Sequence, residues 1–253
     1  MRDDLFMITC AARTGSTLLQ AYIRSHPDVM MHGEVYPPRH VAALQGRYAA
    51  MMGGEDAVAD ITRYRDENQT AFLYKVVYDA QGYKRVGHKF KYEEMLLPQF
   101  AETREAVRRD TDIRILHIYR RNLLERFVSW WMVNHVTGVT MITDESERPE
   151  QRRVTIPFAE MERNFNEVSG RFAFVRKLLS NRPSYEVAYE DLVDEGRKDA
   201  ILSEIQTFLG LDPVKLEAPL KKVTVRSMRE LVENYDDLKG RFAGTPFAEF
   251  FEE

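Results

Sequence analysis

LFMITCAARTGSTLL, residues 5–19, joins an apolar run to a short glycine-containing turn and then to a helical pattern. Residues 5–10 have the length and flanks of a buried strand, and apolar residues recur at helical spacing after the turn. Gly15 lets the backbone approach a ligand closely, and Ser16 or Thr17 can cap the helix. The stretch therefore predicts a strand, a phosphate-sized loop and a helix whose first N–H groups face an anion.

Arg13 adds a permanent positive charge with a planar fork of donors to this loop. The ATP-binding pattern G-x-x-x-x-G-K-[ST] is absent, because the loop has neither the first glycine nor a lysine before the hydroxyl pair. The loop is thus expected to bind phosphate without the residues of an ordinary ATPase.

Composition limits the class of protein. At 253 residues and 44% hydrophobic, the chain can form one large α/β domain, which we expect to span residues 1–253. A net charge of −4 argues against a general nucleic-acid binder. The single cysteine, Cys10, excludes an internal disulfide and cannot alone form a zinc site, and the 6 histidines show no ligand spacing, so no metal is expected. No apolar run approaches the length of a membrane span or a secretory signal, so we expect a cytoplasmic protein without membrane insertion.

Strand and helix patterns alternate along the chain. Further strands are expected at residues 29–32, 86–90, 113–119 and 185–189, whereas 72–78 could be helix or strand. The alternation predicts an α/β fold: three layers, with a mainly parallel sheet and helices on both faces. Ligands of such sheets lie beyond the carboxyl ends of the strands. The loops after four strands should therefore converge on one crevice; these loops follow Cys10, Met31, Tyr119 and Tyr189.

Three longer segments complete the reading. Residues 40–67 read as helical, interrupted at Gly53-Gly54, and lie in a polar, peripheral insertion of about residues 38–70. Residues 136–156 are polar and irregular, which favours a mobile lid or an acceptor-binding segment. Apolar residues from Phe158 to Leu179 recur at three- and four-residue steps and predict a core-facing helix, with a dimer seam as the alternative.

A second phosphate site is suggested by Arg121-Asn122, which follows the strand at 113–119, and by Ser129 farther along. Asn122 and Glu125 have the spacing of a helix cap. Ser129 would then lie about two turns into the helix, roughly 10 Å along its axis.

Taken together, these motifs resemble the sulfotransferases that use 3′-phosphoadenosine-5′-phosphosulfate (PAPS), in particular the bacterial carbohydrate-type branch with its nodulation and glycolipid sulfotransferases. The pieces shared with this branch are Arg13-Thr-Gly-Ser-Thr-Leu-Leu19, Ser25-His-Pro-Asp28, His32-Gly-Glu34, Arg121-Asn122 with Ser129, and Tyr189-Glu-Asp-Leu192. One departure is Leu123, where relatives commonly carry a proline. Proline there only preorganises the helix start, so we expect the site to be retained.

The resemblance implies a P-loop-like sulfotransferase fold and transfer of a sulfuryl group to a hydroxyl acceptor, a carbohydrate or glycolipid. It implies that the 5′-phosphosulfate binds to Arg13, Thr14, Gly15, Ser16 and Thr17, and that the 3′-phosphate binds to Arg121 and Ser129. Lys222, in a basic C-terminal stretch, would close over the 3′-phosphate or belong to a solvated patch.

For catalysis the resemblance points to Glu34 as general base, with His32 as the second candidate. Arg13 would neutralise charge, because arginine cannot donate a proton to the leaving group, and Lys89 is a further donor. The structural alternatives are a salt-bridging role for Glu34 and a core role for His32.

Two other classes of function remain open from the sequence. An ATP-dependent phosphotransferase would share the loop but should carry a P-loop lysine, and a non-catalytic nucleotide-binding protein would keep Arg13 and Ser129 without a working base. The expected partner is a small-molecule or glycan hydroxyl compound rather than nucleic acid, and the sequence permits a homodimer.

Overall fold

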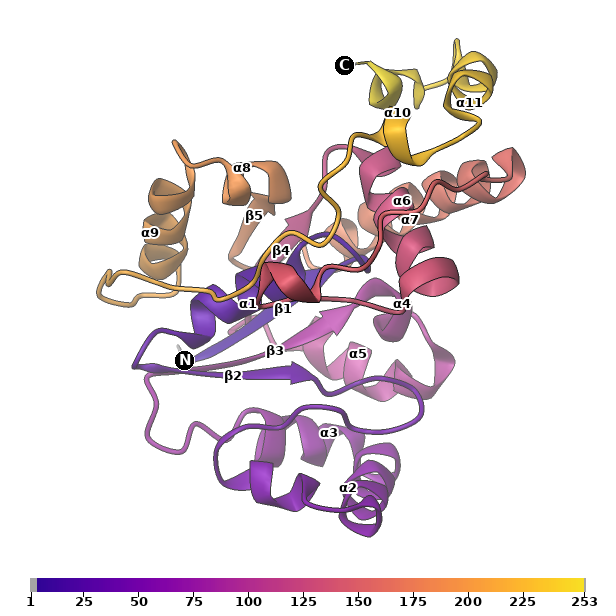
Figure 1. Cartoon of the computed structure of the whole chain (residues 1–253). Coiled ribbons are helices and arrows are strands. Elements are labelled where there is room, and N and C mark those ends of the chain that lie inside the picture. The colour runs from indigo at the N-terminus through magenta and orange to yellow at the C-terminus, as the bar shows by residue number, and fades with distance from the viewer. Residues whose placement is uncertain (1–3, 253) are drawn as a thin grey trace. The chain divides into compact units, whose positions relative to one another are not determined.

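The computed structural model describes residues 4–252 (Figure 1). The chain divides into two compact units. The sheet unit comprises the chain up to Tyr119 together with Phe174–Ala218, and the helical unit comprises Arg120–Ala173 and the chain from Pro219 onward. Within residues 4–252, no helix combines the length and apolar character that a bilayer crossing requires.

The sheet unit is built on one parallel sheet with the strand order β2-β3-β1-β4-β5, counted over the described residues. Its strands are β1 (Leu5–Cys10), β2 (Val29–Glu34), β3 (Arg85–Lys91), β4 (Arg114–Tyr119) and β5 (Ser184–Ala188). Every neighbouring pair is parallel. The predicted strands and the parallel α/β class are confirmed, with end positions that differ by a residue or two.

Helices cover both faces of this sheet, as predicted. On one face, Phe6, Ile8 and Cys10 of β1 pack with α1 (Ser16–Arg24) and α9 (Lys198–Phe208). On the other face, His88 and Phe90 of β3 join an aromatic cluster that comes from the chain between β2 and β3 and from the turn after α4, formed with Tyr36, Phe72, Tyr78 and Phe100. Residues 73–77 form a π-helical turn after α3 (Gln69–Phe72), which settles the helix-or-strand ambiguity.

The strand order places β1 at the centre of the sheet, and the chain changes direction there. It moves from β1 to one side to form β2 and β3, and then crosses β1 to form β4 and β5 on the other side. In parallel sheets this reversal opens a crevice beyond the carboxyl end of the central strand. The loop that follows Cys10 lies at this position.

The segment after β2 differs from its prediction. Residues 40–45 are not helical, because the Gly33 N–H donates to the Ala43 carbonyl at 2.9 Å and the Ala42 N–H donates to the Glu34 carbonyl at 3.2 Å. The chain therefore folds back on β2 before a 3₁₀ turn at Gly46–Met52 and α2 (Glu55–Glu67). Arg65 of α2 is fully buried and donates to the Val35 and Pro37 carbonyls, which ties α2 to this returning segment.

The other helices of the sheet unit are short. They are α4 (Tyr92–Met95), the 3₁₀ turn Pro98–Phe100, α5 (Ala101–Arg109) and α8 (Tyr189–Val193).

The helical unit has a separate core. Its helices are α6 (Leu123–Met132), continued by a π-helical turn at Val133–Thr137, the first part of α7 (Phe158–Leu178), α10 (Met228–Leu231) and α11 (Tyr235–Phe242), with 3₁₀ turns at Glu145–Glu147 and Ala248–Phe251. Met161 and Phe165 of α7 pack in this core with Phe127 and Phe242. Val175 and Leu179, later in the same predicted stripe, are also buried. The core-facing role of the stripe is confirmed.

Candidate active site

The loop after β1 adopts a conformation that few residues tolerate. Arg13 has φ 68° and Gly15 has φ 83°, both in the left-handed region, and a non-glycine residue held there stores backbone strain. The Gly15 carbonyl accepts hydrogen bonds from the N–H groups of Leu18 and Leu19 at 3.0 and 3.1 Å. Gly15 is thus the N-cap of α1.

The expectation that Ser16 or Thr17 caps α1 is wrong. Both residues lie inside the first turn, and among the described residues no side chain caps this helix end. The reason is that the left-handed glycine already supplies the turn into the helix. The first N–H groups of α1 therefore have no side-chain acceptor, and an anion can bind to them.

One hydrogen bond within the loop and contacts from two other segments hold the loop in place. Thr14 is buried, and its hydroxyl donates to the Ala11 carbonyl at 2.9 Å. The Ala12 N–H donates to Glu93 Oε1 of α4 at 3.3 Å. The ring of Tyr189, at the start of α8, lies against Gly15 so closely that a Cβ there would come within 2.2 Å of it. The loop is therefore preorganised before any ligand binds.

Glu34 lies beside this loop because β2 contains one extra residue. Met31 pairs with Gly87 and Glu34 pairs with Lys89, so the register shifts between them. A regular strand would have placed Gly33 opposite Lys89 and turned Glu34 to the other face of the sheet. The irregularity re-aims Glu34 toward the face that also carries α1.

Glu34 makes ion pairs with two lysines of β3. Lys89 Nζ lies 2.9 Å from Glu34 Oε1, and Lys91 Nζ lies 2.8 Å from Oε2. Lys89 Nζ also lies 3.4 Å from Thr17 Oγ1 in the first turn of α1. The Glu34 carboxylate therefore contacts the Lys89 ammonium group, which in turn lies beside the first turn of α1.

The charges in this cluster shift each other's protonation. Burial favours the neutral form of Glu34, but the attraction of Lys89 and Lys91 outweighs burial and lowers its pKa to about 2. Burial opposes the charge of Lys91, yet Glu94 and Glu34 raise its pKa. Glu34 is thus ionised at neutral pH, and its two oxygens are held by cations.

His32 and Cys10 lie close by in the chain but have core environments. His32 is fully buried, its Nδ1 accepts the Gln45 N–H at 2.9 Å, and burial lowers its pKa to about 4. Burial raises the pKa of the Cys10 thiol to about 11, so this thiol is neutral. His32 therefore fastens the segment that returns along β2.

In the helical unit, α6 begins as the sequence predicts. The Asn122 side chain accepts the Glu125 N–H at 3.0 Å and caps the helix, with Leu123 as its first residue. The Glu125 carboxylate pairs with Arg120. Arg121 is exposed just before the cap, and Ser129 is half-buried seven residues after it, about 10 Å along the helix axis.

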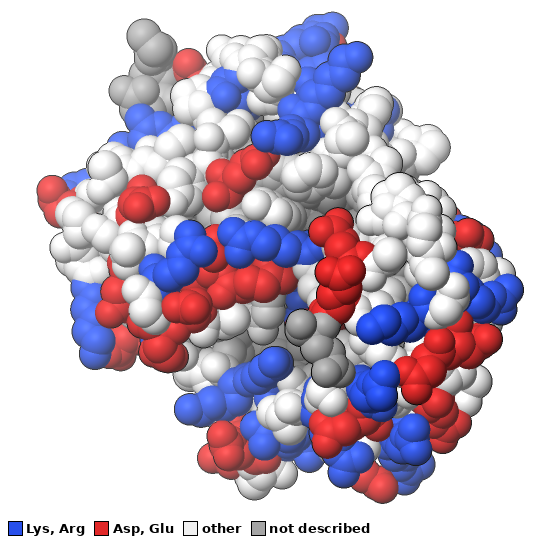
Figure 2. All heavy atoms as spheres, turned by 90° about the horizontal axis from the view of Figure 1, so that it is seen from above, with Lys and Arg blue, Asp and Glu red and all other residues white. Residues whose placement is uncertain are grey.

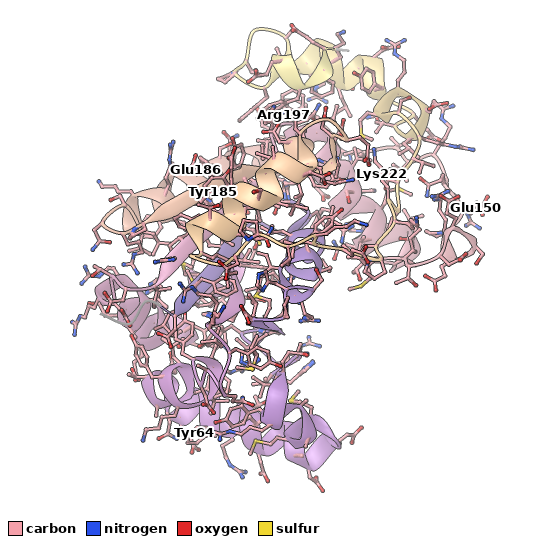
Figure 3. All side chains as sticks on the ribbon, turned by 90° about the vertical axis from the view of Figure 1, so that its left-hand side faces the viewer. Tyr64, Glu150, Tyr185, Glu186, Arg197 and Lys222 are labelled. Carbon is pink, nitrogen blue, oxygen red and sulfur yellow. The ribbon has the colours of Figure 1, made fainter. Side chains whose placement is uncertain are left out.

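The basic C-terminal stretch is bound to the irregular segment at 136–156, also within the helical unit. The Lys221 N–H donates to the Ile142 carbonyl at 3.0 Å, and Gln151 bonds to the Val223 carbonyl at 3.2 Å. Val154 forms a second bridge with Val232. Lys222 is exposed on this extended stretch (Figure 3).

The sequence profile described as "Sulfotransferase family" matches residues 6–215, from the first strand to the end of α9 and beyond. The chain belongs to the sulfotransferase family. Two relatives are similar to this sulfotransferase over 98% of its length: it is 24% identical to Nodulation protein H of Rhizobium meliloti (strain 1021), covering 94% of that protein, and 25% identical to Nodulation protein H of Rhizobium tropici, covering 92% of that protein.

Solved structures share the fold. A sulfotransferase from Alicyclobacillus acidocaldarius superposes with a TM-score of 0.50 at 15% identity, covering 98% of this chain and 94% of that one. The sulfotransferase domain of the Synechococcus PCC 7002 olefin synthase gives a TM-score of 0.54 at 18% identity, covering 92% of this chain and 82% of the domain's chain. These structures confirm the expected fold, and the profile match confirms the expected family.

Sequence reasoning missed three charged residues of the sulfotransferase site, namely Lys91, Glu93 and Glu94. A signal was present, because Lys89 and Lys91 are two residues apart on a strand and so share a face. Two glutamates directly after a strand that carries such a pair can neutralise it. The spacing of these lysines and glutamates indicates a charge cluster only when Glu34 is known to face the same lysines.

On the face shown in Figure 2, Lys and Arg are interspersed with Asp and Glu. Across the described residues, no group of three or more His, Cys, Asp or Glu side chains is placed to hold a metal ion.

Proposed function

We propose that this sulfotransferase transfers the sulfuryl group of PAPS to a hydroxyl group of a carbohydrate or glycolipid, with Glu34 as general base. The observation that carries the proposal is the contact sequence from Glu34 through Lys89 to Thr17. It joins a carboxylate, a buried ammonium group and the start of α1 through distances of 2.9 and 3.4 Å.

The loop between β1 and α1 has the properties that a 5′-phosphosulfate requires. The N–H groups at the start of α1 lie at the positive end of the helix dipole, where they can bind an anion. Gly15 supplies the left-handed turn that leaves these N–H groups without a side-chain cap, and Arg13 contributes a guanidinium group to the same loop. Lys89 adds a second cation from the neighbouring strand.

In the reaction, the acceptor oxygen forms a bond to sulfur while the bond between sulfur and the bridging phosphate oxygen breaks. The acceptor's proton passes to the Glu34 carboxylate, and the electron pair of the broken bond stays on the departing phosphate. By analogy with phosphoryl transfer, positioning and electrostatic stabilisation provide most of the catalysis. Arg13 and Lys89 would stabilise the charge that builds on the phosphate side.

Protonation and exposure favour Glu34 over His32 as the base. The Glu34 side chain is 35% exposed, so an acceptor can reach it, and its pKa of about 2 keeps it ionised. His32 is fully buried, and its Nδ1 already accepts a backbone hydrogen bond.

The 3′-phosphate of the donor is assigned to the helical unit. Arg121 precedes the start of α6, and Ser129 offers a hydroxyl farther along that helix. Lys222 is the third candidate for binding the 3′-phosphate. A second anion site of this kind explains why the loop at Arg13 can lack the lysine of ATP-binding proteins.

The acceptor class rests on the motifs shared with the carbohydrate-type branch. Residues 136–156 remain our candidate for the acceptor-binding segment. Their contacts with Lys221, Val223 and Val232 support a preformed surface rather than a mobile lid.

A ligand-binding measurement tests the donor. Thermal unfolding is recorded with 3′-phosphoadenosine-5′-phosphate and, separately, with ATP and magnesium. A ligand at a hundredfold excess over its Kd stabilises the folded state by about 2.7 kcal/mol. We expect stabilisation by the first ligand only, and stabilisation by ATP with magnesium alone would favour a phosphotransferase.

A transfer assay tests the reaction. PAPS carrying labelled sulfate is incubated with a panel of sugars, glycolipids and simple alcohols. Label is expected in a glycan hydroxyl. Binding of the nucleotide without transfer to any acceptor in a broad panel would favour a non-catalytic nucleotide-binding protein.

A further inference from the structure

The ion pairs at Glu34 continue into a second glutamate. Lys91 Nζ lies 2.8 Å from Glu34 Oε2 and 3.0 Å from Glu94 Oε1, so this lysine bridges two carboxylates. The Glu94 side chain is only 4% exposed. The described cluster is therefore a chain of four charges in the order Lys89, Glu34, Lys91, Glu94.

Glu94 is fixed in position by the backbone. Its Oε2 accepts the Lys91 N–H at 3.3 Å at the start of α4. Lys91 is thus held by a carboxylate that is itself anchored to the end of β3. Lys91 has little freedom to leave Glu34 Oε2.

Lys89 is held differently. It contacts Glu34 Oε1 at 2.9 Å and approaches Thr17 Oγ1 at 3.4 Å, next to the N–H groups of α1. An anion bound at α1 would lie within reach of this ammonium group and would compete with Glu34 for it. The two oxygens of Glu34 are therefore unequal: the cation on Oε2 is anchored, and the cation on Oε1 borders the donor loop.

We propose that Lys91, anchored by Glu94, is a positioning residue that holds Glu34 Oε2, so that Oε1 becomes the proton-accepting oxygen when Lys89 turns from it to the bound donor. The inference rests on the proposed function. On this proposal, Glu34 can accept a proton only after the donor has bound. If the acceptor binds before the donor, both oxygens of Glu34 are still paired with lysines.

The electrostatics follow the same order. With both lysines in place, Glu34 is a weak base, because two cations stabilise its ionised form. Moving Lys89 to the donor removes one of these cations and raises the basicity of Glu34. The remaining groups near the cluster are Glu93 of α4, the neutral thiol of Cys10 on β1 and the hydroxyl of Thr17 on α1.

The test compares Lys91→Met with Lys91→Arg and Glu94→Gln. Transfer from saturating PAPS is measured from about pH 5 to about pH 8, and 3′-phosphoadenosine-5′-phosphate binding is measured in parallel. Lys177→Met, at an exposed position of α7, is the matched control. Should Lys91→Met not fold, Lys91→Gln removes the same charge with a polar side chain.

Wild type and the Lys177 control are expected to keep a level rate across this range. Lys91→Met should lose about 10²-fold in rate, as misplaced groups do, and its remaining rate should fall toward acid pH, because Glu34 has lost its anchored cation. Lys91→Arg should restore the level profile. Glu94→Gln should lower the rate and keep the profile level, because Lys91 still carries its charge.

The outcomes separate the two proposals. If wild type transfers sulfate and the Lys91→Met profile has the same shape as the wild-type profile, the positioning role is refuted and the proposed function stands. A purely structural role is indicated if Lys91→Met and Glu94→Gln change folding and rate alike with no change in profile. If wild type neither binds the nucleotide nor transfers sulfate, the proposed function itself fails.

Discussion

Replacing Gly15 by alanine tests the geometry of the donor loop most directly. Gly15 has φ 83°, and a Cβ at this position would lie 2.2 Å from Cδ2 and 2.9 Å from Cε2 of the Tyr189 ring. Real Cβ atoms essentially never come so close to another heavy atom. Gly15→Ala therefore meets two separate penalties, one in its own backbone and one against Tyr189.

The two penalties can be given magnitudes. A left-handed conformation costs an ordinary L-residue roughly 1–2 kcal/mol. Forcing an extra methyl group into a packed position costs roughly 1–3 kcal/mol. Gly15→Ala should thus lower the free energy of unfolding by about 2–5 kcal/mol, which corresponds to a fall in Tm of about 4–20 °C for a chain of this size.

Denaturant titration and thermal unfolding measure this loss, with Gly82→Ala as the matched control. Gly82 also has a positive φ, 91°, but a Cβ there would meet nothing within 4 Å. Gly82→Ala should therefore lower the free energy of unfolding only by the cost of the left-handed backbone, about 1–2 kcal/mol. A double-mutant cycle that combines Gly15→Ala with Tyr189→Ala should give a coupling free energy of about 1–3 kcal/mol, which is the cost of the clash between the added methyl group and the ring.

The reasoning would be refuted if Gly15→Ala cost no more than Gly82→Ala. It would equally be refuted if the cost of Gly15→Ala were the same with and without the Tyr189 ring. In either case the ring would not hold the loop in the conformation described above.

Two further predictions concern the assigned site. Glu34→Gln should still fold and bind 3′-phosphoadenosine-5′-phosphate, but its rate of sulfate transfer should fall by about 10²- to 10⁴-fold. The control Glu162→Gln, at an exposed position, should keep the wild-type rate. An unchanged rate in Glu34→Gln would assign the base to another group. Arg121→Ala combined with Ser129→Ala should weaken nucleotide binding in calorimetry while circular dichroism shows unchanged helix content, with Arg163→Ala as control. Intact binding in that double variant would place the 3′-phosphate elsewhere.

The irregularity in β2 shows how sequence and structure divide the information about Glu34, the proposed base. His32-Gly-Glu34 marks a polar strand end, and its resemblance to a family motif singles out Glu34. Alternation along a regular strand gives no indication that Glu34 shares a face with Lys89. The extra residue that brings them together depends on Gly33 pairing with Ala43, a contact made by a segment that the sequence pattern assigned to a helix.

The loop after Cys10 shows a similar division. The sequence located the loop and identified Gly15 as a position that needs a small residue. It could not indicate that Tyr189, more than 170 residues later, presses on that glycine, because the contact exists only when the fold brings the start of α8, directly after β5, against the start of α1. The same limit led the sequence to assign the cap of α1 to Ser16 or Thr17.

The sequence by itself determined the five described strands, the parallel α/β class, the position of the glycine-containing loop after the first strand and the family. These follow from local periodicity, turn chemistry and motif spacing, all of which act over a few neighbouring residues. The tertiary structure alone decided how charges pair: that Lys89 and Lys91 hold the two oxygens of Glu34, and that Glu94 anchors Lys91. The strength of such ion pairs depends on the distance between the charges, which strand register sets, and on the local dielectric constant, which burial sets. Neither register nor burial is encoded within a single segment of the chain.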